Sequence, residues 1–178
     1  MNPGGNSGVT LAAGANVLLS AVVGARATDI LAHQSVDEVV TAEATFQEVQ
    51  EYASQLARKK RLSLDVVLLA VAALPVRVVA REDYAGAVPK AEKRIGGRDP
   101  DDIDLLALAI QLQIPVWSNH NDFEGTGVEW YTTAELLKRL FCPPGPAYAE
   151  RRIGTNRIST RWFSATPILR SMAREWPS

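Results

Sequence analysis

Short runs of apolar residues alternate along the chain with longer stretches in which apolar residues recur every three or four positions. The short runs predict buried strands at residues 9–13, 37–41, 76–80, 115–118 and 128–131. The longer stretches predict helices over residues 17–24, 27–33, 42–61, 64–74, 82–96, 100–112 and 134–141, with a break near Pro89 in the fifth of them. This alternation predicts an α/β fold, a three-layer α/β/α sandwich with a central parallel sheet of about five strands.

Cap residues predict where several of these helices begin. Asn16 is expected to cap the first helix, because its side chain can accept a hydrogen bond from a free main-chain N–H. Asp99 is expected to cap the helix of residues 100–112, with Pro100 in its first position. Thr132 or Thr133 is expected to cap the last helix. Asn16 and Thr132 lie near the carboxyl ends of predicted strands, where functional sites of parallel sheets form.

The composition suits one domain with extensions. The chain has 178 residues, of which 47% are hydrophobic, which is enough for a sizeable core. We expect a flexible N-terminus at residues 1–8, the domain at 9–142, and a Pro-rich linker with a basic tail at 143–178. Residues 150–178 carry six Arg and two Glu, together with Trp162, Phe163 and Trp176. Such a tail suits binding of single-stranded nucleic acid, and a disordered or packed extension is the alternative.

The remaining composition excludes several classes of protein. A single Cys and two His leave no intrachain disulfide and no Cys/His zinc site. The net charge of −1 gives no overall sign of a nucleic-acid partner. The apolar runs at residues 17–23 and 64–76 are too short to span a bilayer, and no positive segment precedes the first. We therefore expect a soluble, cytoplasmic protein without a membrane partner.

Four aspartates crowd into six residues before and within the helix of residues 100–112. Asp99 is expected to serve only as a cap, and Asp101 and Asp104 are expected to be solvated. Asp102 differs, because it lies one and two turns before apolar residues of the buried stripe. A carboxylate at the edge of a core faces a site or a partner more often than open water. Asp102 is therefore a candidate functional residue.

Further polar residues could join Asp102 at one edge of the sheet. Glu48 borders the apolar stripe of the 42–61 helix, although a solvated glutamate is the ordinary alternative. Asp122 and His120 follow the fourth strand, where Asp122 could instead form an Asx turn, and Asn16 follows the first. Oxygen-rich clusters of this kind bind Mg²⁺ or Mn²⁺. Phosphodiester hydrolysis uses such ions to activate water and to neutralise developing charge.

Three segments of the chain resemble the PIN domains, which include the VapC-like toxin ribonucleases of toxin–antitoxin pairs. They are VTLAAGANVLLSAVVG, TAEATFQEVQEYASQLARKKRLS and IGGRDPDDIDLLALAIQLQIPVWSNHNDFEGTGVEWYTTAELLKRL. The resemblance covers about residues 9–141. It implies a Mg²⁺- or Mn²⁺-dependent endoribonuclease directed at single strands, often a homodimer and often inhibited by an antitoxin that occupies the acidic groove.

The resemblance also assigns residues and shows two departures. It implies catalytic and metal-binding roles for Glu48, Asp102 and Asp122. Gly14 and His120 stand where the family pattern has aspartates. Gly14 offers no ligand, whereas the imidazole of His120 suits Mn²⁺, Zn²⁺ or Ni²⁺ better than Mg²⁺. Any surviving site is therefore expected to prefer a transition metal, unless His120 is only a loop residue.

Three functions remain open from the sequence. The first is a ribonuclease that hydrolyses RNA by metal-activated water and is impaired by the changes at Gly14 and His120. The second is a catalytically inactive PIN-like module that binds RNA or a protein partner. The third is a structural homo-oligomer without a ligand.

Overall fold

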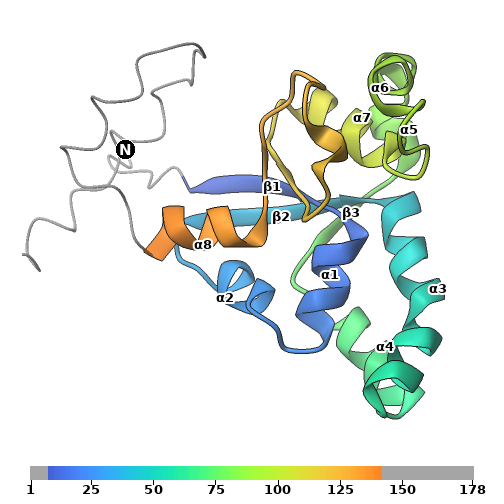
Figure 1. Ribbon diagram of the computed structural model, residues 1–178, viewed down its shortest axis with the longest axis vertical. Coiled ribbons are helices and arrows are strands. Elements are labelled where there is room, and N and C mark those ends of the chain that lie inside the picture. The colour runs from blue at the N-terminus through green and yellow to red at the C-terminus, as the bar shows by residue number, and fades with distance from the viewer. Residues whose placement is uncertain (1–7, 142–178) are drawn as a thin grey trace, which may run out of the picture.

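A five-stranded parallel sheet forms the centre of the computed structural model, which describes residues 8–141 (Figure 1). The strands are β1 (Val9–Ala13), β2 (Val36–Ala42), β3 (Arg77–Val79), β4 (Val116–Trp117) and β5 (Trp130–Tyr131). Their order across the sheet is β3-β2-β1-β4-β5, and every neighbouring pair is parallel. The predicted α/β fold with a parallel sheet is therefore confirmed. The predictions for residues 1–7 and 142–178 lie outside the described residues.

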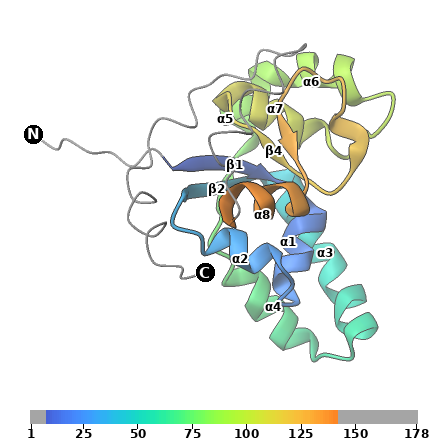
Figure 2. The ribbon, with the colours of Figure 1, turned by 60° about the vertical axis from the view of Figure 1, so that its left-hand side comes forward.

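Helices cover both faces of this sheet. They are α1 (Ala15–Val22), α2 (Ala27–Leu31), α3 (Glu43–Lys60), α4 (Leu64–Ala72), α5 (Arg81–Tyr84), α6 (Val88–Ile95), α7 (Ile103–Leu112) and α8 (Thr133–Phe141), with 3₁₀ turns η1 (Ala85–Ala87) and η2 (Asn121–Phe123). Helices α5, α6 and α7 lie on one side, and α1, α2, α4 and α8 lie on the other (Figures 1 and 2).

Two hydrophobic clusters fill the spaces between the layers. Alternate side chains of β1 point to opposite faces, so that Leu11 and Ala13 belong to one cluster and Ala12 to the other. Trp117, at the end of β4, is fully buried against the first face, and Leu106 of α7 is fully buried against the second. Since each face has its own core, the three layers predicted from the sequence are present.

Two predicted caps are wrong. Helix α1 begins at Ala15 with Gly14 at the N-cap, because the chain turns into the helix directly after the strand. The side chain of Asn16 is instead used in contacts with the loop after β4. Helix α7 begins at Ile103 with Asp102 at the N-cap. Asp99 does not cap it, because its Oδ1 accepts a hydrogen bond from Asp101 N (3.1 Å) in a separate turn.

The predicted break near Pro89 is confirmed. Residues 81–95 form α5, the turn η1 and α6, with Pro89 in the first turn of α6. Proline has no main-chain N–H and is tolerated only at a helix start, so one continuous helix cannot form through this segment. In residues 8–141, no helix is long and apolar enough to cross a membrane.

A capping box starts α8. Glu135 Oε2 accepts hydrogen bonds from Thr132 N (2.9 Å) and Thr132 Oγ1 (3.0 Å), and Glu135 N donates to Thr132 Oγ1 (3.3 Å).

Replacing Thr132 with alanine removes this cap and is expected to lower the free energy of unfolding by about 1 kcal/mol. Urea denaturation measures the change. Lys138→Ala, at an exposed position of the same helix, is the control, and an equal effect of both variants would refute the role of the cap.

Candidate metal centre

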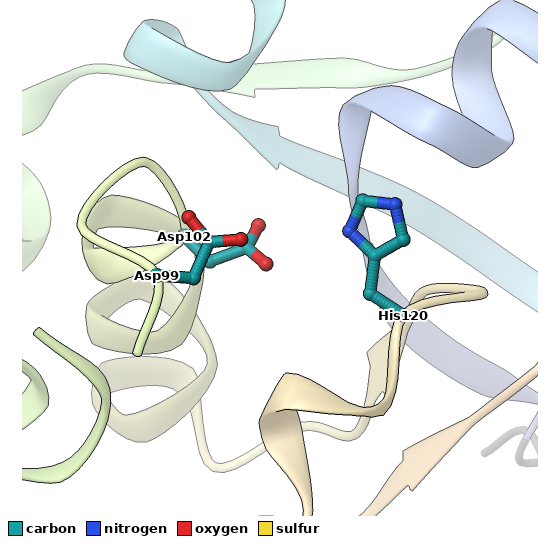
Figure 3. A group of neighbouring side chains, drawn as sticks. All are labelled: Asp99, Asp102 and His120. Atoms are coloured by element: carbon teal, nitrogen blue, oxygen red, sulfur yellow. The ribbon is translucent and has the colours of Figure 1, made fainter. Parts of the chain in front are cut away.

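Two aspartates and one histidine meet beyond the end of β4. A ligand atom from each of Asp99, Asp102 and His120 lies within 4.8 Å of the other two. Figure 3 shows the two carboxylates, which come from the chain before α7, on one side of a gap and the imidazole on the other. The group therefore joins the start of α7 to the loop after β4, at the edge of the sheet where parallel strands place functional sites.

Hydrogen bonds hold the histidine side of the cluster in place. Ser118, which is fully buried, accepts a hydrogen bond from His120 N (3.2 Å) and another from Asn16 Nδ2 (3.0 Å). Asn16 Oδ1 accepts in turn from Asn119 N (3.1 Å). Asn16 thus ties the first turn of α1 to the loop that carries His120. The supporting role predicted for Asn16 stays a prediction, and its contacts are not those of a helix cap.

Burial and like charge disfavour ionisation of Asp102. Burial first, and then the negative charges of Asp99, Glu48 and Asp122, raise the pKa of Asp102 to about 7, against an opposing contribution from His120. The Oδ2 atom of Asp102 is buried and has no hydrogen-bond partner among the described residues. An ionised carboxylate in such a position lacks a counter-charge, and a cation would supply one.

Glu48 lies in the same electrostatic field. It is half-buried on α3, and burial raises its pKa, followed by the charges of Asp101 and Asp99, with His120 acting in the opposite direction. Asp122, half-buried in η2, raises the pKa of Asp102. Of the four residues predicted to bind metal, Asp102 and His120 bring ligand atoms together, whereas Glu48 and Asp122 lie outside that group and act on Asp102 through their charges. Their individual roles stay predictions.

Gly14 borders the cluster from the end of β1. A Cβ atom added there would lie 3.2 Å from Leu105 Cδ2 and 3.6 Å from Ser118 Oγ. The backbone at Gly14 is extended, with φ −81° and ψ 163°, so that no glycine-specific conformation is required. An aspartate at this position would project between α7 and the end of β4. The glycine itself offers no ligand atom at this position.

Asp99 is the residue of this cluster for which the sequence predicts only a helix cap. It precedes Asp102 by three positions, a spacing that can place two side chains on the same side of a turn. That spacing was the available signal. It was outweighed by the Asp-Pro pair, which is typical of a helix start.

Comparisons with known proteins decide the family. A family model of the PIN domain matches residues 13–141, which is more than half of the chain. The chain belongs to the PIN domain family. Among curated proteins, none matches this PIN chain. A solved structure, VapBC2 from Rickettsia felis bound to a DNA fragment from their promoter, contains a chain that matches it with a TM-score of 0.55 and 11% identity. The match covers 70% of this chain and 98% of the other, and at this identity it shows the fold alone.

The donor set of this PIN domain fits a divalent cation. Carboxylate oxygens are the ligands that Mg²⁺ and Mn²⁺ share, and an imidazole nitrogen adds affinity for Mn²⁺ over Mg²⁺. The observation that favours an ion here is Asp102 Oδ2, a buried oxygen with no hydrogen-bond partner among residues 8–141, because a cation would compensate its burial.

Proposed function

We propose that this PIN domain is a metal-dependent endoribonuclease whose activity is weakened by Gly14. It hydrolyses phosphodiester bonds of single-stranded RNA with Mg²⁺ or Mn²⁺. The observation that carries the proposal is the meeting of Asp102 and His120 with Asp99 beyond the end of β4, where the buried Oδ2 of Asp102 has no hydrogen-bond partner among residues 8–141. The negative charges of Glu48 and Asp122 also act on Asp102. Within the PIN family, such a cluster of acids at the strand ends supports metal-dependent chemistry on phosphates.

The side chains divide into two tasks in this proposal. Asp102, Asp122 and His120 hold the cation, because Asp102 and His120 bring ligand atoms together from the start of α7 and the loop after β4, and Asp122 follows His120 in that loop. A bound cation lowers the pKa of water and offsets the charge that develops on the phosphate. Glu48 accepts a proton from the attacking water at its carboxylate, for which its raised pKa is suited.

The weakening follows from the charge that is missing at Gly14. A carboxylate beside Ser118 would add a unit of negative charge next to the cation. Its absence lowers the affinity for the ion and leaves phosphate binding to a smaller set of ligands. A PIN-like module that binds RNA or protein without cleaving is the second candidate, and it is favoured by the same missing ligand.

Replacement of Glu48 tests the proposal. Glu48→Gln is expected to lower the rate of single-stranded RNA cleavage with Mn²⁺ by roughly a hundredfold, since a general base contributes about 10²–10⁴-fold. The rate is measured on a labelled oligonucleotide under single-turnover conditions. Glu51→Gln, at an exposed position of the same helix, is the matched control and should retain the native rate. Equal rates for the two variants would reject the role of Glu48.

We further infer a protein partner of the antitoxin class and a homodimer. The similar solved structure is a VapBC2 complex, which supports a partner protein. Helix α4 adds physical support, because Leu64, Val66, Leu68 and Leu69 are between 42% and 71% exposed on it. An apolar cavity of about 330 Å³ lies beside it, lined by residues of α1, α2 and the end of α4. Light scattering of the purified chain, with and without a candidate antitoxin, measures both associations.

A further inference from the structure

We propose that Asp99 supplies the carboxylate that Gly14 lacks, so that the cation is held by Asp99, Asp102 and His120. This rebuilt centre selects Mn²⁺ or another transition metal over Mg²⁺. The inference rests on the proposed metal-dependent function and assigns a residue that neither the sequence nor the family pattern marked as a ligand.

The spacing of the three side chains suits a single ion. Donor atoms about 2.0–2.3 Å from one cation lie at most about 4.5 Å from each other. One ligand atom from each of Asp99, Asp102 and His120 lies within 4.8 Å of the others. Small rotations of the side chains would therefore bring all three into the coordination sphere. In Figure 3 the carboxylates and the imidazole face the same gap.

Each of the three residues retains a free ligand atom. Asp99 uses Oδ1 to accept from Asp101 N, and no hydrogen bond to its Oδ2 occurs among residues 8–141. Asp102 Oδ2 is buried and has no hydrogen-bond partner in the described part of the chain. His120 is anchored through its main-chain N–H, while its exposed ring forms no hydrogen bond in the same part of the chain. The backbone of both loops is thus fixed independently of the atoms that would bind the ion.

The turn before α7 explains why Asp99 rather than Asp101 completes the site. The Asx turn at Asp99 and the late start of α7 place Asp99 and Asp102 together, whereas Asp101 is exposed and outside the group. Two carboxylates provide two negative charges, which match a divalent cation. The neutral imidazole then favours Mn²⁺, Co²⁺ or Zn²⁺ over Mg²⁺, which prefers oxygen ligands.

The test measures metal binding in the absence of RNA. The full chain is stripped with chelator, and Mn²⁺ binding is followed by electron paramagnetic resonance, with Mg²⁺ as a competitor. Asp99→Asn is expected to weaken Mn²⁺ binding at least tenfold, whereas Asp101→Asn should stay within twofold of the native chain. His120→Asn should reduce the preference for Mn²⁺ over Mg²⁺ at least tenfold. Co²⁺ absorption in the visible range reports directly whether the imidazole is a ligand.

Several outcomes overturn the inference. It fails if Asp99→Asn binds Mn²⁺ as Asp101→Asn does, if Mg²⁺ competes on equal terms, or if the native chain binds no ion. Thermal melting controls for folding, and the amide oxygen of Asn can keep the turn to Asp101 N. RNA cleavage separates this result from the proposed function. If cleavage requires Glu48 but not Asp99, the proposed nuclease function stands and the metal site that includes Asp99 is rejected. If Asp99 contributes to ion binding but the chain cleaves no RNA, the metal site stands and the nuclease function is rejected.

Discussion

Restoring aspartates at Gly14 and His120 together is expected to raise the rate of RNA cleavage with Mg²⁺ roughly a hundredfold above the native rate. The physical reason is electrostatic, because a preorganised charge next to the reacting phosphate contributes about 10²–10³-fold. Gly14→Asp adds an oxygen ligand, and His120→Asp replaces a nitrogen ligand that Mg²⁺ binds poorly. Each single change is expected to give part of this gain.

The structure allows the first of these changes. The extended backbone of Gly14 accepts any side chain, and the nearest atom to an added Cβ is the terminal Cδ2 of Leu105 at 3.2 Å. A shift of this side-chain end by a few tenths of an ångström would accommodate the added Cβ. Gly14→Asn, which has the same shape without the charge, is the matched control and should give no gain. A native chain that already cleaves as fast as the double variant would show that the site is not damaged.

Asp102→Asn is expected to stabilise the metal-free protein at pH 8 while it abolishes metal-dependent cleavage. The pKa of Asp102 is raised from 3.8 to about 7, so ionisation opposes folding. The whole shift corresponds to roughly 4 kcal/mol, and partial exposure to solvent reduces the expected gain to about 2 kcal/mol. For a chain of this size, this gain raises the melting temperature by about 4–8 °C. The side chain of Asp102 makes no capping hydrogen bond among the described residues, so the substitution removes no cap from α7.

The pH dependence of this gain has a defined sign. Because the folded-state pKa of Asp102 lies above its unfolded value, the native metal-free protein loses stability as the pH rises from about 4 to about 7. The advantage of Asp102→Asn is therefore complete above pH 7 and absent below pH 4. Thermal melting in chelator at several pH values measures it, with Asp101→Asn as the control. A variant that melts below the native chain at pH 8 would contradict the burial of an unpaired charge.

The fold could be predicted because its elements have simple signals. Strand β1 is a short apolar run that ends at a glycine, and α3 carries Val49 and Ala53 on one fully buried face. Alternation of such strands and helices allows few arrangements other than a parallel sheet. Ends of helices were less predictable. Asn16 and Asp99 both have the chemistry of a cap, but pattern alone does not show whether the backbone turns before or after them.

The site could be predicted only in part for a related reason. Parallel strands bring their carboxyl ends together, so residues after β1 and β4 were expected to meet, and Asp102 was expected beside them. The position of Asp99 depends on the turn formed with Asp101 N, which is a local hydrogen bond rather than a periodic pattern. The pairing of Asn16 with Ser118 joins residues 102 positions apart, and no local signal announces it.

Cleavage of a labelled single-stranded RNA by the purified native chain tests the central claim most directly. The cleavage rate of the native chain is measured with Mn²⁺ and with excess chelator. The rate of the Asp102→Asn variant is measured with Mn²⁺. The account predicts slow cleavage by the native chain with Mn²⁺ and only background with chelator or with Asp102→Asn. RNA cleavage that persists in chelator or in the Asp102→Asn variant would contradict this prediction. A native chain whose cleavage rate stays at background with Mn²⁺, and whose rate is not raised by Gly14→Asp and His120→Asp, would also contradict it.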